Sequence, residues 1–326
     1  MAIEFFTGFE GCGRSGDVRS LFDVAYSVAY SSSGGYANGK CIQATGFNQL
    51  FKQYCIPAKR KAMGCHVRNL GNRTYSADSN YRFLYFEGPK IGVNNTPSGL
   101  DVRVAGSPLG VFGIPINTDI HHVEMEVYSH PTEGEVKIKV DDVVVVDLTA
   151  VNTGGEDITA CVFGSGYSSA ACCDNVYIAD TLQGELFSLL RKPSEDVSVE
   201  FTPSMGEENY ALISEAAQDG DASYVESNTL GQEDLYKYEE VSAVYEIKGV
   251  SLVTFAKKSE AGERLLRVKA EQGMVSYDIG EEVALPLEYP TAQGSDVLRI
   301  LETAPDGTSW DATKFNAIKW GFRVSG

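Results

Sequence analysis

Residues His121-His122-Val123-Glu124-Met125-Glu126-Val127-Tyr128 open the stretch 121–180 that decides the fold. Valine and methionine alternate there with glutamate and tyrosine, which is the period-two pattern of a strand with one dry and one wet face. Residues 129–134 follow as a turn cluster that contains a proline and a glycine. Residues 135–140 alternate again, so the stretch begins with two strands joined by a turn.

Aspartates bracket the third strand of this stretch. Asp141-Asp142 predicts a tight turn, and the valines of 143–146 then lead into Asp147. A run of valines of this length fits a strand buried on both faces better than a helix. Two more strand-like segments, at 161–166 and at 173–180, follow a Gly-Gly break.

This succession resembles the second half of a concanavalin-A-like (laminin-G-like) jelly-roll domain. The letters HHVEMEVYS stand where that family has a W-H-H-V strand, and KIKVDDVVVVD stands where it has two strands around a V-D-G turn. The closing CDNVYIAD is similar to the family's D-D-V-Y-I-x-D strand. The resemblance implies a β-sandwich. Because lectins, glycosidases and structural proteins share this fold, the resemblance alone gives no function.

The residues before this stretch extend the strand pattern. Residues 3–10 end in G-F-E, which is typical of jelly rolls in phage structural proteins, where the first strand pairs near the last. Residues 22–30 alternate strictly, and residues 36–43 fit another strand. We expect about ten to twelve short strands and no helix in this half. The basic residues within 52–61 predict a solvated loop.

A second resemblance lies in residues 208–241, ENYALISEAAQDGDASYVESNTLGQEDLYKYEEV. Their ordered pattern, N-Y-A followed by D-G-D, Y-V-x-S and D-L-Y, is similar to a segment of tailed-phage virion proteins that directly follows a jelly roll. The closing letters DGTSWDATKFNAIKWGFRV resemble the end of the same module. Strands are expected at 197–201, 243–256, 263–270, 274–278 and 296–302.

These patterns predict an all-β protein of two tandem β-sandwich domains. Residues 1–182 form the concanavalin-A-like jelly roll, residues 183–196 form a linker, and residues 197–326 form a second, acidic sandwich. A chain of 326 residues fits this division, because a domain takes about 100–200 residues.

The charge of the chain excludes some partners. The net charge is −18; residues 1–180 carry 14 Lys and Arg against 19 Asp and Glu, and residues 181–326 carry 13 against 26. An acidic surface repels phosphate backbones, so we expect no nucleic-acid binding. No apolar run approaches the roughly 20 residues of a spanning helix, and the first residues lack the features of a signal peptide. We therefore expect the protein to be made in a host cytoplasm and not to insert into a membrane.

All seven cysteines lie in the first half, at positions 12, 41, 55, 65, 161, 172 and 173. Their spacing contains no C-x-x-C pair, which argues against structural zinc. We expect most of them to be small buried hydrophobes. The alternative is oxidation after the product leaves the cell, with Cys172, Cys173 and Cys12 as candidates for a disulfide or cross-link. Cys172 and Cys173 would point to opposite faces of a strand.

Glu124 and Glu126 invite a catalytic hypothesis. Two residues apart on a strand, their side chains face one way, about 7 Å apart. Retaining glycosidases on the jelly-roll fold pair an acid and a nucleophile in this way. This sequence has Met125 where those enzymes have Asp, and no third acidic residue closes the motif. We therefore expect both glutamates to face solvent at a strand edge, and no enzyme.

The histidines and turn aspartates raise the question of a metal. His121 and His122 should point to opposite faces of a strand, which disfavours a shared ion. No D-x-D-x-D-G calcium loop is present. Asp141 and Asp174 are the remaining candidates for a jelly-roll calcium site, but turns favour aspartate for backbone reasons alone. We expect no metal and no cofactor.

Two functions remain. The first is a non-enzymatic structural component on the exterior of a tailed-phage virion: a tail, neck or collar, baseplate or fibre protein. Its partners would be other virion proteins and itself, as a homo-oligomer with a trimer favoured. The alternative is a carbohydrate-binding adhesin that contacts a host-surface glycan through exposed aromatics. Candidates for that aromatic platform are Tyr75, Tyr81, Tyr167 and Trp310.

Overall fold

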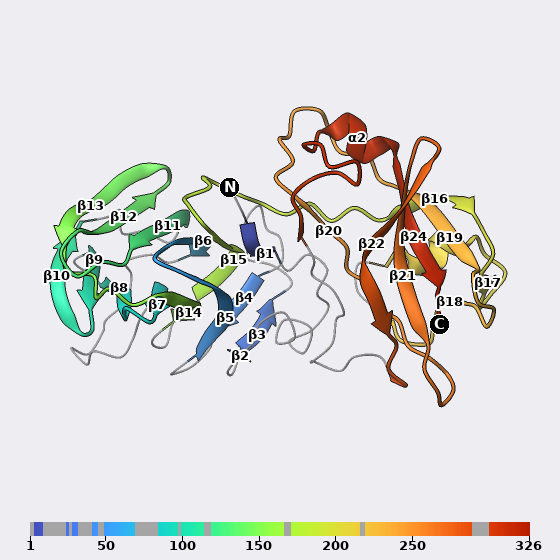
Figure 1. The fold of residues 1–326 in the computed structure, drawn as a ribbon, viewed down its shortest axis with the longest axis horizontal. Coiled ribbons are helices and arrows are strands. Elements are labelled where there is room, and N and C mark those ends of the chain that lie inside the picture. The colour runs from blue at the N-terminus through green and yellow to red at the C-terminus, as the bar shows by residue number, and fades with distance from the viewer. Residues whose placement is uncertain are drawn as a thin grey trace. The chain divides into compact units, whose positions relative to one another are not determined.

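The computed structural model describes residues 3–8, 24–25, 28–31, 41–44, 49–68, 84–96, 99–113, 119–165, 171–215, 219–288 and 300–326. The chain divides into two compact units, Met1–Leu189 and Leu190–Gly326. Antiparallel strands make up nearly all of the regular structure (Figure 1), which confirms the predicted all-β class with β-sandwich jelly-roll architecture. No helix in the described part of the chain has the length and apolar character needed to cross a membrane.

Unit 1 is built from two antiparallel sheets. The eight-stranded sheet A has the order β13-β12-β11-β6-β15-β4-β3, with β1 also paired to β15. Its strands are β1 (Ile3–Thr7), β3 (Val28–Ser31), β4 (Cys41–Ala44), β6 (Arg60–Arg68), β11 (Ile120–Tyr128), β12 (Gly134–Val140), β13 (Val143–Val151) and β15 (Ala171–Ala179). The seven-stranded sheet B has the order β10-β9-β8-β7-β14-β5-β2. Its strands are β2 (Val24–Ala25), β5 (Gln49–Ala58), β7 (Leu84–Glu87), β8 (Ile91–Thr96), β9 (Gly99–Val104), β10 (Ser107–Phe112) and β14 (Ile158–Ser165).

The core of unit 1 is formed by apolar side chains from both sheets. Val123, Met125 and Val127 of β11 are fully buried in it, as their alternation predicted. They share this core with aromatic side chains of sheet B, among them Phe86 and Phe163. The alternation of β11 therefore fixes which of its side chains lie on the other face of sheet A.

The ends of the jelly roll meet as the sequence predicted, but its strand boundaries differ. β1 pairs antiparallel with β15, so the first strand does lie beside the last. The expected single strand at 22–30 is divided, because β2 belongs to sheet B and β3 to sheet A. Within the described residues unit 1 has fifteen strands, more than the ten to twelve expected.

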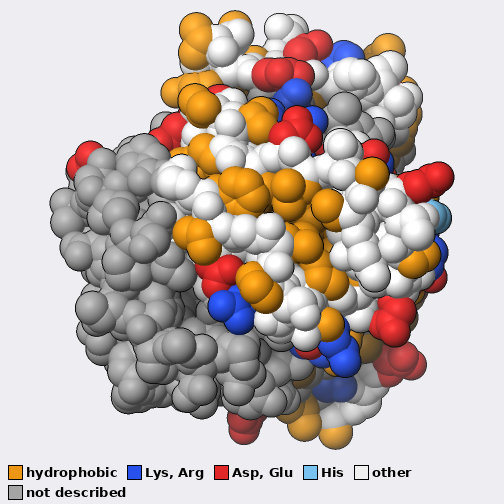
Figure 2. All heavy atoms as spheres, turned by 90° about the vertical axis from the view of Figure 1, so that its left-hand side faces the viewer, with side chains coloured by type: hydrophobic (Ala, Val, Ile, Leu, Met, Phe, Trp, Pro, Cys, Tyr) orange, Lys and Arg blue, Asp and Glu red, His pale blue; other side chains and the backbone are white. Residues whose placement is uncertain are grey.

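The prediction that the valine strand is buried on both faces is wrong. β13 is the outermost strand of sheet A and pairs only with β12, so Val143 and Val144 are 64% and 47% exposed. β10, the edge of sheet B, lies at the same side of the sandwich (Figure 1) and exposes Val111. Figure 2 looks at this side and shows hydrophobic side chains gathered across the middle of the face.

The basic segment 52–61 is not a solvated loop. It belongs to β5 and the start of β6. Lys61 is almost fully buried and is ion-paired with Glu4 and with Asp180, whose Oδ1 lies 3.0 Å from the ammonium nitrogen. Charge clustering in the sequence did not reveal this, because both acidic partners are more than fifty residues away.

Unit 2 is organised around the five-stranded antiparallel sheet C, with the order β16-β19-β24-β21-β22. These strands are β16 (Pro193–Ser198), β19 (Glu233–Tyr238), β21 (Leu265–Gln272), β22 (Val275–Ala284) and β24 (Ile318–Val324). Two two-stranded ladders join β17 (Thr202–Pro203) to β18 (Val225–Glu226), and β20 (Val250–Ser251) to β23 (Ile300–Leu301). The long strand expected at 243–256 is thus reduced to β20 among the described residues.

The sequence also missed the short helix α2 (Ala312–Ala317), which Asp311 caps through its carboxylate on the Lys314 N–H. Phe315 of this helix packs in the core of unit 2 with Trp310 and Trp320. Both tryptophans of the chain therefore report on unit 2.

Candidate functional site

The face of β11 opposite the core carries His122, Glu124 and Glu126. β11 lies between β6 and β12 inside sheet A, so it is not a strand edge. Glu124 is 0% exposed, and the expectation that it faces solvent is wrong. The reason is that residues 181–188, which follow β15, cover it; we call them the crossing segment. An uncompensated buried carboxylate would be very unfavourable, so its partners define the site.

Glu124 binds the crossing segment through its backbone. The Oε1 atom accepts hydrogen bonds from the Gln183 N–H at 3.0 Å and the Gly184 N–H at 2.8 Å. It also accepts one from the Tyr177 hydroxyl. Burial, together with the nearby Glu124 carboxylate, raises the pKa of Tyr177, so this phenol stays a neutral donor.

Gly64 of β6 makes room for that phenol. Gly64 is paired both with Glu124 and with Tyr177 across the sheet. A Cβ at position 64 would lie 2.3 Å from Cε1 of the Tyr177 ring. The ring can therefore lie flat over sheet A only because residue 64 has no side chain.

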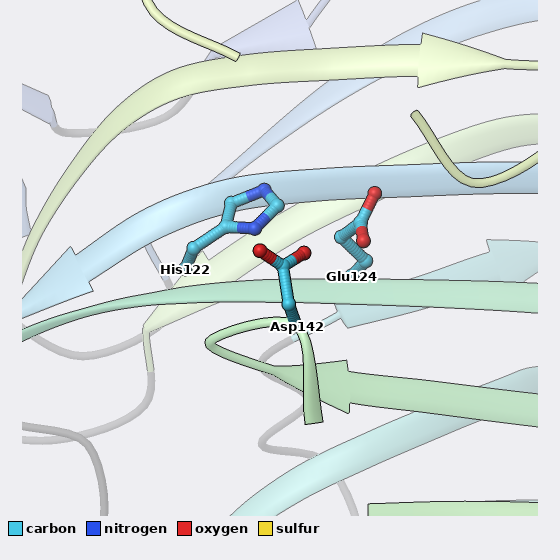
Figure 3. A group of neighbouring side chains, drawn as sticks. All are labelled: His122, Glu124 and Asp142. Carbon is cyan, nitrogen blue, oxygen red and sulfur yellow. The ribbon is translucent and has the colours of Figure 1, made fainter. Parts of the chain in front are cut away.

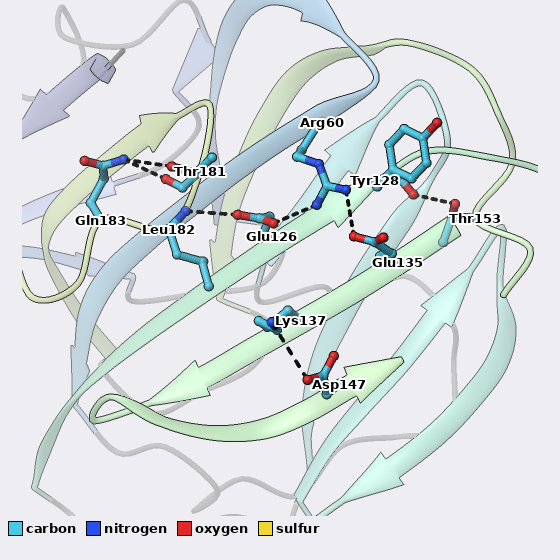
Figure 4. Close-up of polar contacts among 10 residues, drawn as sticks. All are labelled: Arg60, Glu126, Tyr128, Glu135, Lys137, Asp147, Thr153, Thr181, Leu182 and Gln183. Carbon is cyan, nitrogen blue, oxygen red and sulfur yellow. Dashed lines mark hydrogen bonds and ion pairs between the residues drawn. The ribbon is translucent and has the colours of Figure 1, made fainter. Parts of the chain in front are cut away.

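Glu126 holds the crossing segment at a second point (Figure 4). One Glu126 oxygen accepts a hydrogen bond from the Leu182 N–H at 3.1 Å, and the other accepts one from Arg60 Nη1 at 2.8 Å. Arg60 also donates to Glu135 at 2.7 Å, and its guanidinium carbon lies 4.9 Å from the centre of the Tyr128 ring. Both strand glutamates are thus used to hold chain and side chains in place.

Further contacts secure the rest of the crossing segment. Leu186 packs with Tyr177 in a small apolar cluster. His66 Nε2 lies 2.9 Å from Glu185, and the Ser188 N–H donates to the Asn175 side chain at 3.0 Å. A glycosidase pair needs both carboxylates beside the scissile bond. Here the polypeptide itself occupies the space in front of Glu124.

The turn between β12 and β13 carries the predicted metal candidate Asp141. Asp141 and Asp142 both have positive φ, 50° and 64°, which confirms the tight turn. Asp141 accepts from the His122 N–H at 2.9 Å, and its other oxygen lies 2.6 Å from His121 Nδ1. These contacts tie the turn to β11.

The other metal candidate, Asp174, is buried and accepts from the Asn175 N–H at 2.7 Å. Among the described residues, the potential ligands that come close together are His122, Glu124 and Asp142. Neither Asp141 nor Asp174 belongs to this group. The sequence placed Asp142 in the same turn as Asp141 but did not distinguish it as the ligand candidate, because only the hairpin brings it to β11.

The described cysteines are free thiols. Cys173 is buried on β15 beside Cys65, and Cys161 is buried beside Cys55. A hydrogen bond from Cys161 lowers the pKa of the half-buried Cys55, whereas burial raises that of Cys161. Cys12 and the side chain of Cys172 lie outside the described residues, so the proposed cross-links through them stay predictions.

In unit 2, residues of the virion-like pattern form one buried polar network. The two oxygens of Asp234 accept four hydrogen bonds: from the N–H groups of Glu200 (2.7 Å) and Phe201 (2.8 Å), from Asn209 Nδ2 (2.6 Å) and from the Tyr236 hydroxyl (2.7 Å). Asp234 is completely buried. Asn209 and the D-L-Y residues of the pattern are therefore explained by packing and hydrogen bonding.

The predicted aromatic platform is not supported at Trp310. Its ring is buried in the core of unit 2, and its Nε1 donates to the Leu301 carbonyl at 2.7 Å. Tyr75, Tyr81 and Tyr167 lie outside the described residues. An aromatic that the sequence analysis passed over, Tyr54 of β5, is 55% exposed, with the Lys52 ammonium 4.6 Å from its ring centre.

Comparison with known proteins gives likenesses of fold only. No protein-family model and no curated protein matches the chain. Among solved structures it is similar to alginate lyase Aly36B, with 14% identity over 55% of this chain and 94% of that one, at a TM-score of 0.37. The globular domain of T. cruzi calreticulin is similar with 11% identity over 56% of this chain and 89% of that one, at a TM-score of 0.35. The carbohydrate-binding module CBM66 of Bacillus subtilis is similar with 12% identity over 48% of this chain and 93% of that one, at a TM-score of 0.32.

Gly64→Ala should destabilise unit 1 by about 1–3 kcal/mol, because the new methyl group must displace the Tyr177 ring. Tyr177→Phe should cost about 1.5–3 kcal/mol, since it removes a donor to a buried carboxylate. Tyr128→Phe is the matched control on the same face and should cost less. The measurement is urea unfolding followed by far-ultraviolet circular dichroism. Tryptophan fluorescence reports on unit 2, so an early shift in fluorescence alone would contradict this assignment.

Asp234→Ala should destabilise unit 2 by about 3–5 kcal/mol, because four donors lose their shared buried acceptor. The transition followed by tryptophan fluorescence should move to lower urea. Glu207→Gln, at an exposed position directly before segment 208–241, should leave the free energy of unfolding within about 0.5 kcal/mol. Equal midpoints for the two variants would refute the structural role given to Asp234.

Proposed function

We propose that the chain is a non-enzymatic structural protein on the exterior of a tailed-phage virion, in its tail, neck or collar, baseplate or fibre. The observation that carries the proposal is the use of Glu124 and Glu126. These two carboxylates are the obvious catalytic candidates, and both hold the backbone of the crossing segment against sheet A. Carboxylates that are used to hold the chain itself support a rigid building block in preference to a catalytic pair.

The virion-like pattern in residues 208–241 supports the finer assignment. Its residues Asn209, Asp234 and Tyr236 interlock in a buried network. Such a network maintains a fold and performs no chemistry, which suits a module used repeatedly for its shape. The resemblance of this segment to virion proteins supports placing the chain in the virion, with synthesis in the host cytoplasm.

The partners would be other virion proteins and further copies of this chain, with a trimer favoured. Exposed apolar side chains at the edge strands β13 and β10 offer surface for such contacts. Apolar surface that is contiguous and exposed commonly marks interaction sites, and an unpaired edge strand also presents free backbone groups.

We expect an antibody raised against the purified chain to label the outside of intact phage particles that contain it, as seen by electron microscopy. The purified chain should release no oligosaccharides from host-surface polysaccharides, because the crossing segment keeps a polymer away from the buried Glu124. Glu126→Gln should leave this blank result unchanged. Oligosaccharide release that Glu126→Gln abolishes, or absence of the chain from purified particles, would contradict the proposal.

A carbohydrate-binding adhesin is the second candidate, and the exposed Tyr54 ring favours it. Aromatic faces suit the apolar face of a sugar, and the ammonium of Lys52 beside the ring offers a hydrogen-bond donor. For this reading, a glycan array should give binding that Tyr54→Ala weakens at least tenfold and that Tyr85→Ala, on β7 of the same sheet, does not weaken. No binding on the array would leave the purely structural function.

A further inference from the structure

A small group of unpaired polar atoms lies where β11 meets the β12–β13 turn. His122 is 4% exposed, and neither of its ring nitrogens has a hydrogen-bond partner. Glu124 is fully buried, and its Oε2 also has no hydrogen-bond partner. Its Oε1, in contrast, accepts three hydrogen bonds. Leaving a buried polar atom without a partner costs about 1–3 kcal/mol. Three such atoms lie on two side chains that face the same way, so together they can serve as ligand atoms.

The third member of the group is Asp142, which comes from the turn (Figure 3). One donor atom each of His122, Glu124 and Asp142 lie within 4.8 Å of one another. His122 and Glu124 share a face because they are two residues apart on a strand. Asp142 faces them from the hairpin, and it is exposed, so an ion from solvent can reach the group.

We propose that His122, Glu124 and Asp142 bind a divalent transition-metal ion of the Zn²⁺ type. One imidazole nitrogen and two carboxylate oxygens are a donor set that suits zinc, whereas calcium and magnesium prefer oxygen donors alone. Three protein ligands leave a position for water in a four-coordinate site. Two negative carboxylates balance the charge of the ion.

The surroundings hold these ligands in place before a metal arrives. Tyr177, Gln183 and Gly184 fix the Glu124 carboxylate through Oε1, which orients Oε2. Asp141 fixes the turn that carries Asp142 by bonding to the backbone of His122. Outer hydrogen bonds of this kind orient metal ligands and raise affinity. The ion would therefore link the β12–β13 hairpin to β11 and raise the stability of unit 1.

The test uses the full chain after removal of metals with a chelator. Calorimetric titration with Zn²⁺ should show one tight site, and one equivalent should raise the thermal midpoint of unit 1; Ca²⁺ and Mg²⁺ should do neither. Asp142→Asn should weaken Zn²⁺ binding at least tenfold and leave the metal-free midpoint unchanged, because asparagine tolerates positive φ. Glu133→Gln, in the turn at the other end of β12, is the matched control and should bind normally.

Two further measurements separate this site from the cysteines. His122→Leu should abolish the site while keeping the metal-free fold, because it replaces unpaired nitrogens with an apolar group. Co²⁺ in place of Zn²⁺ should give absorption typical of nitrogen and oxygen ligands, without a thiolate charge-transfer band. A thiolate band, unchanged affinity in Asp142→Asn, or no bound zinc in the wild-type chain would each overturn the proposal.

Discussion

The hydrogen bonds between the Glu124 carboxylate and the backbone of the crossing segment fix the path of the chain over sheet A. Glu124 projects from the middle of sheet A, where a charge without partners would be strongly destabilising. The N–H groups of Gln183 and Gly184 and the Tyr177 hydroxyl compensate for this. The path of the chain over the sheet at this point therefore stabilises the fold, and the same path places residues 183 and 184 directly against Glu124.

Unit 2 solves the same physical problem in the same way. Asp234 is fully buried on β19. It accepts hydrogen bonds from the N–H groups of Glu200 and Phe201, which lie more than thirty residues earlier in the chain. In each unit one carboxylate attaches an irregular segment to a sheet. Such a contact has definite geometry, so it selects one path for a segment that packing alone would leave less well defined.

The sequence predicted those features that depend on local pattern. The alternation of Val123, Met125 and Val127 identified β11 and its core face, and the aspartate pair identified the turn after β12. It did not predict which strands would be central and which would be edges. Val143 and Val144 are exposed, and Glu124 is buried, because of pairings and coverings made by residues far away in sequence. The three-residue group at His122, Glu124 and Asp142 escaped notice for the same reason: only strand pairing brings the turn back to β11.

The distribution of open and closed surfaces in unit 1 bears on how it would contact other molecules. The crossing segment covers Glu124 on sheet A, whereas β13 and β10 end their sheets with exposed valines. Natural edge strands usually carry lysine, proline or a covering segment that prevents pairing with other chains. Residues 143–146 of β13 contain neither lysine nor proline. Pairing or packing with another chain would cover an exposed apolar edge of this kind, which is why the proposed assembly role places its contacts there.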